Sequence, residues 1–296
     1  MPAIDRDLSP VAGHFFDSGG GVRMHYLDEG HGPPVVMVHG NPTWSFYYRD
    51  VVRRLRGRYR CIVPDHVGCG LSDKPPAARY PYSLKRRVAD LTALLNHLRL
   101  DRDVTLVVHD WGGMIGTAWA TRFPERVKRL VVLNTAAFPL PRTKDLPLSL
   151  RIARNTTLGA VLVRGLNLFC RAAARWCTVR RPLPPAVRRM YLAPYDSWAN
   201  RIAVLKFVQT IPLTGHDPGY DVVADTESRL PRLVDKPVLI CWGMRDFVFD
   251  EAFLDEWRAK FPKAEVHRYE DAGHYILEDA GEEVGLRVEE FLARTE

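Results

Sequence analysis

An apolar run at residues 104–108 leads through His109 into Asp110, and the small-residue sequence Trp111-Gly112-Gly113 follows at once. A helical pattern then continues to about residue 123. A short buried strand, a sharp turn with small residues and a helix are typical of a nucleophile elbow, which raises one side chain above a sheet. The segment therefore predicts an α/β sheet with the carboxylate of Asp110 in the raised position.

A carboxylate in this position restricts the chemistry. Serine that attacked a saturated carbon would leave an ether, which water does not readily cleave, whereas a carboxylate forms an ester or an anhydride that a later step resolves. Asp is also favoured at the start of a helix, so Asp110 could simply cap the helix that follows it. Residues elsewhere in the chain have to decide between these two interpretations.

Apolar runs typical of strands alternate with helical patterns along most of the chain. The first two predicted strands are joined by Ser18-Gly19-Gly20-Gly21, which predicts a hairpin at the edge of a sheet. The predicted strands are residues 14–16, 22–27, 33–38, 61–64, 104–109, 127–133, 237–242 and 264–269, and the predicted helices are 45–55, 83–98, 111–123, 252–261 and a last one from about 282. Repeated strand and helix units predict a mostly parallel sheet with helices on both faces.

The middle of the chain has a different character. Residues 138–225 show helical stretches broken by prolines and no convincing strand, which predicts an inserted helical cap between two core segments, 1–137 and 226–296. Residues 138–219 contain thirteen Lys and Arg residues and three acidic ones, a net charge of +10 in a chain whose formal net charge is +7. A solvated basic face is the plainest explanation; a membrane surface or an acidic partner are alternatives, and no motif for binding nucleic acid is present.

One stretch of this predicted cap, residues 158–170, is unusually apolar for a cap helix. Ordinary packing against the core explains it best. It could also line a groove for long alkyl chains, dock a partner or touch a membrane surface.

The composition bounds the class of protein. Of the 296 residues, 46% are hydrophobic, which is enough for a large core. The five cysteines are scattered without metal-ligand spacing and are predicted to be buried reduced thiols; no metal or cofactor is expected. Residues 1–7 lack the pattern of a signal peptide, and no apolar run reaches the length of a membrane span. These features predict a soluble, cytoplasmic protein.

Polar residues stand at or just after the ends of several predicted strands: Asn41, Asp110, Asn134, Asp246 and His274. Functional residues of such sheets gather at the carboxyl ends of the strands. A histidine on a loop there can act as a base if a carboxylate holds its ring, and the chain order Asp110, Asp246, His274 is the order nucleophile, acid, base that elbow enzymes use. Asp246 could instead be a turn residue and His274 a structural one. Asn134 stands one strand earlier, where some enzymes of this kind carry the acid, but its uncharged amide cannot provide the negative charge beside the histidine.

Two further residues are predicted to donate hydrogen bonds. The backbone N–H groups of Asn41 and Trp111 stand where an oxyanion hole would form, and their side chains add an amide and an indole N–H. Packing is the alternative for each residue on its own. His39 and His109 flank these motifs and are predicted to point into the structure.

Four segments together resemble the haloalkane dehalogenase family of α/β-hydrolases. They are His39-Gly40-Asn41-Pro42-Thr43-Trp44, residues 64–75, His109-Asp110-Trp111-Gly112-Gly113 and Asp271-Ala272-Gly273-His274. The resemblance covers nearly the whole chain and is weakest in the predicted cap. It implies an α/β-hydrolase fold, with Asp110 as nucleophile, His274 as base, Asp246 as acid, and Asn41 and Trp111 as the pair that binds the leaving halide.

The combination of Asn41 and Trp111 with an acid at Asp246 resembles the third subfamily. Residues 243–250, which include Phe247-Val248-Phe249, and residues 269–279 resemble its members from olefin biosynthesis. That resemblance implies decarboxylation of cis-3,4-dialkyl-oxetan-2-ones to cis-alkenes and carbon dioxide, a small hydrophobic substrate, and a homo-oligomer or an assembly with pathway enzymes such as a β-lactone synthetase. Hydrolytic dehalogenation is the alternative. An epoxide hydrolase, which would use cap tyrosines such as Tyr191 and Tyr195, and a non-catalytic scaffold are weaker alternatives.

Overall fold

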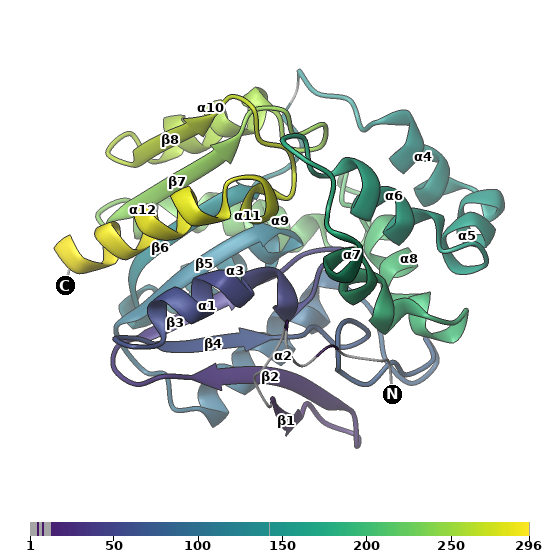
Figure 1. Ribbon diagram of the computed structural model, residues 1–296, viewed down its shortest axis with the longest axis horizontal. Helices are drawn as coiled ribbons and strands as arrows, with labels where there is room; N and C mark the ends of the chain where they lie inside the picture. The colour runs from purple at the N-terminus through teal and green to yellow at the C-terminus, as the bar shows by residue number, and fades with distance from the viewer. Residues whose placement is uncertain (1–4, 6–7, 9–12, 142, 296) are drawn as a thin grey trace.

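The computed structural model describes residues 5, 8, 13–141 and 143–295. Most of the segment at residues 1–7, for which no signal peptide is predicted, lies outside them. An eight-stranded sheet with the order β1-β2-β4-β3-β5-β6-β7-β8 forms the centre of the molecule (Figure 1). Its strands are β1 (His14–Asp17), β2 (Arg23–Glu29), β3 (Pro34–Val38), β4 (Arg60–Pro64), β5 (Val104–Asp110), β6 (Val127–Thr135), β7 (Val238–Gly243) and β8 (Glu265–Tyr269). The β1–β2 and β2–β4 pairs are antiparallel, and all the others are parallel.

Helices cover both faces of this sheet. Successive residues of a strand point to opposite faces, so Val35 and Met37 belong to one core cluster, and Val36 and Val38 to the other. The first face packs against α1 (Arg49–Leu55) and α12 (Gly281–Arg294), and the second against α2 (Leu84–His97), α3 (Trp111–Arg122), α9 (Tyr220–Arg229) and α10 (Glu251–Lys260). Burial on both faces explains why the strands are nearly continuous apolar runs.

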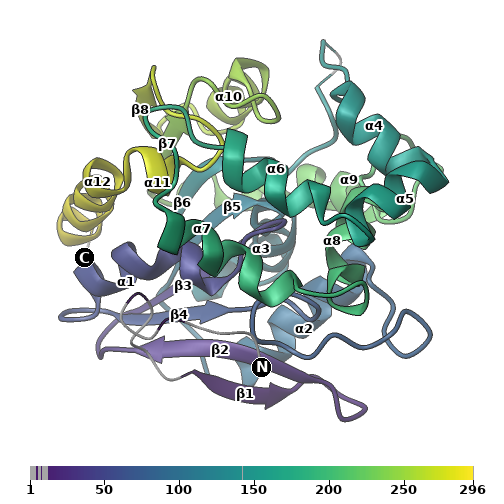
Figure 2. The same ribbon diagram turned by 45° about the vertical axis from the view of Figure 1, so that its right-hand side comes forward.

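The segment between β6 and β7 supplies the helices at the carboxyl ends of the parallel strands (Figures 1 and 2). They are α4 (Leu148–Asn155), α5 (Thr157–Arg164), α6 (Leu168–Trp176), α7 (Pro185–Leu192) and α8 (Ile202–Gln209), followed by α9. The predicted insertion of helices is therefore present. Its predicted limits at 138 and 225 stay predictions, and the second falls inside α9.

The apolar stretch at residues 158–170 differs from the single cap helix that its composition suggested. It forms α5 and the start of α6, which are bent by 70° at a short break. The break includes Asn167, the residue before α6, whose φ of +54° is left-handed and lies outside the α-helical region. No single helix in the described part of the chain is long and apolar enough to cross a membrane; α5 and α6 pass that test only as a bent pair.

Local signals placed most of the elements correctly. The hairpin, every predicted strand and the helices α2, α3, α10 and α12 are present, and the hydroxyl of Ser83 accepts a hydrogen bond from the backbone N–H of Arg86 as an N-cap. The helix predicted at 45–55 is a 3-10 turn, η1 (Ser45–Tyr48), followed by α1, and the short α11 (Ile276–Asp279) was not predicted. All five cysteines are buried and free, as expected.

Candidate active site

Asp110 is the last residue of β5 and immediately precedes α3. Its φ of +51° is unusual for a residue with a side chain and produces the sharp turn of the elbow. Glycine is needed beside this turn: a Cβ on Gly112 would lie 1.9 Å from the carbonyl oxygen of Val38, and a Cβ on Gly40 would lie 1.9 Å from Oδ1 of Asp110. The hydroxyl of Thr135 donates a hydrogen bond to the backbone carbonyl of Asp110. The neighbouring strands thus hold the elbow in position.

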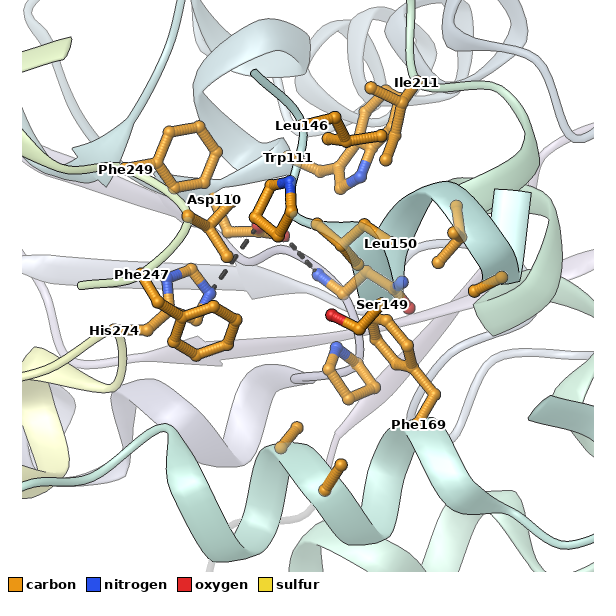
Figure 3. Close-up of a pocket in the computed structure, with 18 of the residues that line it drawn as sticks. Asp110, Trp111, Leu146, Ser149, Leu150, Phe169, Ile211, Phe247, Phe249 and His274 are labelled. Carbon is orange, nitrogen blue, oxygen red and sulfur yellow. Dashed lines mark hydrogen bonds and ion pairs between the residues drawn. The ribbon is translucent and has the colours of Figure 1, made fainter. Parts of the chain in front are cut away.

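The three residues predicted to form a catalytic set lie together, and Figure 3 shows two of them, Asp110 and His274. His274, on the loop between β8 and α11, has Nδ1 2.8 Å from Oδ2 of Asp246, and its Nε2 lies 3.7 Å from Oδ2 of Asp110. The other oxygen of Asp246 accepts a hydrogen bond of 2.7 Å from the backbone N–H of Val248. Because the carboxylate occupies Nδ1, the Nε2 side of the imidazole faces Asp110.

The charges of this set influence one another because all three side chains are buried. Burial raises the pKa of Asp110 above its ordinary value, although His274 and two backbone N–H groups oppose that rise. Burial would lower the pKa of His274, but the nearby carboxylates of Asp246 and Asp110 outweigh it and raise the pKa. The two carboxylates therefore make protonation of His274 more favourable than that of a free imidazole.

The two oxygens of Asp110 have different surroundings. Oδ1 accepts a hydrogen bond of 2.6 Å from the backbone N–H of Asn41, and the backbone N–H of Trp111 also donates to this carboxylate. These are the N–H groups that the sequence suggested for an oxyanion hole, and here they hold the carboxylate itself. Oδ1 is thus held by the N–H of Asn41, whereas Oδ2 lies on the side of His274.

The side chains of Asn41 and Trp111 line the cavity in front of Asp110. The amide nitrogen of Asn41 donates to the carbonyl of Val204 at 3.3 Å, which uses one of its two hydrogens. The indole of Trp111 packs against Phe207 with ring centroids 5.1 Å apart, and its N–H makes no hydrogen bond within the part of the chain that the structure describes. Both side chains can therefore still donate to an anion in the cavity.

The cavity has a volume of about 470 Å³ and lies between the sheet and the cap helices. Its floor is Asp110, His274, Asn41 and Trp111, and most of its remaining wall is apolar. The apolar wall includes Leu146, Leu150, Phe169, Ile211, Phe247 and Phe249 (Figure 3). A buried carboxylate at the bottom of an apolar cavity suits a ligand with large hydrocarbon parts and one reactive polar centre.

The remaining polar residues singled out in the sequence lie outside this constellation. His39 bonds to the Gly40 carbonyl at 2.7 Å, and His109 bonds to the His274 carbonyl at 2.8 Å, so both point into the structure as predicted. Asn134 joins β6 to β7, because its side chain both accepts from the N–H of Gly243 and donates to the carbonyl of that residue. It helps to fix the strand that precedes Asp246.

The two cap tyrosines considered for epoxide chemistry do not line the cavity. The hydroxyl of Tyr191 donates to the carboxylate of Glu278, and that of Tyr195 donates to the carbonyl of Thr43 at 3.3 Å. Neither can polarise a ring oxygen at Asp110 in this arrangement.

Comparison with known proteins agrees with this geometry. Residues 33–281 match the family model for the alpha/beta hydrolase fold. The chain belongs to the α/β-hydrolase family. A cis-3-alkyl-4-alkyloxetan-2-one decarboxylase from Shewanella oneidensis is 55% identical over 98% of this chain and 91% of its own length. The enzyme of the same name from Xanthomonas campestris is 48% identical over 93% of each chain.

Haloalkane dehalogenases are more distant relatives. Haloalkane dehalogenase 2 from Mycobacterium tuberculosis is 34% identical over 96% of each chain. The crystal structure of the dehalogenase DatA from Agrobacterium tumefaciens superposes with a TM-score of 0.85 at 27% identity and covers 97% of each chain. The resemblance seen in the sequence motifs is therefore confirmed, both to the dehalogenases and to the decarboxylases among the α/β-hydrolases.

Sequence reasoning missed several residues around the site. The ring of Phe249 stacks on His274, with centroids 5.9 Å apart and an interplanar angle of 20°. Lys144 forms an ion pair with Asp250 and lines the cavity together with Ser149. The phenylalanine stood in a motif quoted for its resemblance alone, whereas no local signal indicated that residues 144 and 149 would reach the cavity.

Proposed function

We propose that this α/β-hydrolase is a β-lactone decarboxylase that converts cis-3-alkyl-4-alkyloxetan-2-ones to cis-alkenes and carbon dioxide, with Asp110 as the nucleophile. The observation that carries the proposal is the buried Asp110 carboxylate, 3.7 Å from His274 at the floor of an apolar cavity of about 470 Å³. The identity of 55% to a curated decarboxylase supports the choice of substrate class. We place the reaction in long-chain olefin biosynthesis by the same resemblance.

In the mechanism we favour, Oδ2 of Asp110 attacks C4 of the oxetanone, the ring carbon that bears oxygen. It approaches from the side opposite the C4–O bond, which breaks and leaves its electron pair on oxygen as a carboxylate attached to C3. The side chains of Asn41 and Trp111 donate to that oxygen as it gains charge, in the way they would hold a departing halide.

The second step regenerates the enzyme. The bond between C3 and the carboxylate breaks, its electron pair forms the C3=C4 double bond, and the ester oxygen leaves C4 as the Asp110 carboxylate. Inversion at C4 followed by anti elimination gives a cis-alkene from a cis-lactone. No water or net proton is consumed. His274 therefore acts electrostatically and stabilises the Asp110 carboxylate as it leaves C4, consistent with the raised pKa of His274.

Haloalkane dehalogenation is the second candidate, because relatives at 34% identity carry that name and the same first step would displace a halide. There the ester on Asp110 must be cleaved by water that His274 activates. Epoxide hydrolysis is disfavoured because the hydroxyls of Tyr191 and Tyr195 are engaged outside the cavity. A scaffold without activity is disfavoured by the complete set of nucleophile, base, acid and donors.

A paired turnover assay tests the proposal. Purified protein receives a cis-3,4-dialkyl β-lactone in one vial and a bromoalkane of similar length in another. We expect alkene and carbon dioxide from the lactone much faster than bromide from the haloalkane. Rapid bromide release with an inert lactone would overturn the decarboxylase proposal and favour a dehalogenase. Heavy-oxygen water adds a mechanistic check, since lactone turnover should place no label in Asp110.

The expected assembly and location extend the proposal. By resemblance, the protein forms a homo-oligomer or a complex with pathway enzymes such as a β-lactone synthetase, and it acts in the cytoplasm. Light scattering of the protein alone and mixed with a synthetase tests the first point. A strictly monomeric protein in both samples would contradict it.

A further inference from the structure

The cap exposes an unusual number of large apolar side chains. Twelve large hydrophobic residues are exposed in the described part of the chain, and seven of them lie within α4, α5, α6 and the α5–α6 loop. These seven, which we call the cap face, are Leu148, Ile152, Leu158, Val161, Leu166, Leu168 and Trp176. Figure 2 shows that α4, α5 and α6 follow one another side by side in the cap. Single exposed apolar residues are ordinary, but seven of them on neighbouring helices indicate an interaction surface.

Arginines accompany the apolar residues in a regular way. Leu148 and Ile152 are four residues apart on α4, and Leu168 and Trp176 are eight apart on α6, so each pair forms one ridge of its helix. Arg151, Arg171 and Arg175 each stand one residue before a position on these ridges and are exposed. They form no ion pair within the described residues, in contrast to Arg154 and Arg180 of the same segment. The positive charge beside the cap face is therefore free to meet an anionic surface.

Part of the cavity wall belongs to this face. Ile152, Leu168 and Trp176 line the cavity and are also 38%, 45% and 63% exposed, and Phe247 from the core completes this apolar rim at 48% exposure. A hydrocarbon chain that leaves the cavity past these side chains would meet apolar surface and not water. An entrance of this kind fits a ligand that is exchanged with an apolar phase.

We infer that the cap face binds the surface of an anionic lipid bilayer, with the mouth of the cavity turned toward the acyl chains. An interfacial helix carries apolar residues such as Leu and Trp on one side and Lys or Arg beside them, as α4 and α6 do. The α5–α6 pair has the composition of a membrane segment but is bent by 70°, which suits a structure that lies in the interface. A bilayer also leaves the cavity mouth in contact with an apolar phase, whereas a protein partner or a second copy would cover it.

Vesicle flotation without substrate tests this inference independently of the proposed activity. We expect the protein to float with vesicles of phosphatidylcholine and phosphatidylglycerol, to bind phosphatidylcholine alone more weakly, and to lose binding as salt is added. Arg171→Gln/Arg175→Gln should weaken binding roughly 30-fold, because each basic residue near an anionic surface contributes about fivefold. The matched control is Arg79→Gln/Lys85→Gln, which changes one exposed residue before α2 and one within it. This variant should bind like the wild type.

A second pair of variants tests the apolar part of the surface. Leu168→Asp/Trp176→Asp should abolish flotation, whereas Leu286→Asp, at a residue 43% exposed on α12, should leave it unchanged. Wild-type protein that stays unbound with anionic vesicles would overturn the inference, and this result needs no variant to fold. Equal flotation of the cap and control variants would also overturn it. Dissociation of an oligomer by the cap variants, without any vesicle binding by the wild type, would assign the face to contacts between copies instead.

Discussion

The core and the cap contribute to one cavity in different ways. The core supplies the polar floor, on which hydrogen bonds of 2.6 to 2.8 Å orient Asp110, Asp246 and His274. The cap supplies mainly apolar wall and, on its outer side, exposed apolar residues beside unpaired arginines. We therefore expect the core to set the chemistry through contacts that tolerate little change, and the cap to select the hydrocarbon part of the proposed substrate.

The largest effect is expected at the centre of the core site. Asp110→Ala should abolish turnover, with a loss of roughly 10⁴-fold or more, because no other group can form the ester. The protein should remain folded, and its free energy of unfolding should not fall, because the substitution removes a buried carboxylate with a raised pKa. Alkene formation and urea unfolding measure the two effects. Asp235→Ala, in an exposed loop, is the control, and an active Asp110→Ala protein would rule out covalent catalysis.

Asp246→Asn tests how strongly the core depends on the orientation of one ring. The amide keeps the shape of the side chain but presents a donor to Nδ1 of His274 as readily as an acceptor, so the ring loses its fixed orientation and its counter-charge. We expect the rate of turnover to fall by about 10²- to 10⁴-fold, by analogy with other catalytic triads. If His274 acts only electrostatically on the lactone, the loss should be smaller for lactone than for bromoalkane. Equal losses for both substrates would contradict a purely electrostatic role of His274 in the lactone reaction.

The contrast between core and cap also explains which features the sequence alone could predict. Strand positions followed from continuous apolar runs, and the set of Asp110, Asp246 and His274 followed from their places after strand ends, because parallel strands bring their carboxyl ends together. The break at Asn167 did not follow, since apolar composition alone does not indicate a left-handed residue. Ser149 and Phe249 reach the cavity through packing between distant segments, and no local pattern encodes such contacts.

Substitutions in the core should lower the free energy of unfolding much more than substitutions on the cap face. Ile240 is fully buried in β7, so Ile240→Ala should lower the free energy of unfolding by about 2–5 kcal/mol through lost contacts and a cavity. Leu158, 59% exposed on α5, should tolerate Ala within about 0.5 kcal/mol. Urea unfolding of both variants measures the difference. A large loss for Leu158→Ala would mean that the cap face is packed against protein in solution, most simply against a second copy.

A smaller effect is expected on the choice of alkyl chain. Ala172 of α6 lines the cavity, and Ala172→Phe should reduce the space available to the substrate. Each methylene that no longer fits removes about 0.8 kcal/mol of apolar burial, so kcat/KM should fall about fourfold per methylene for long chains and little for short ones. Lactones of graded chain length provide the measurement. Thr157→Phe, at an exposed position on α5 outside the cavity wall, should leave the profile unchanged, and a uniform loss at all lengths in Ala172→Phe would contradict a role in chain selection.

The smallest effect concerns the pH dependence of stability. The pKa of His274 in the folded protein is raised above 6.5 because Asp246 and Asp110 favour the imidazolium. Its contribution to the free energy of unfolding is therefore fully present below about pH 6.5 and is lost as the pH rises through the folded pKa. The stability difference between wild type and His274→Gln, measured by urea unfolding, should shrink as the solution becomes alkaline, whereas His216→Gln, in an exposed loop, should show no such trend. A difference that grows with pH would mean that the folded site prefers neutral imidazole, and it would restore the general-base role that a dehalogenase requires.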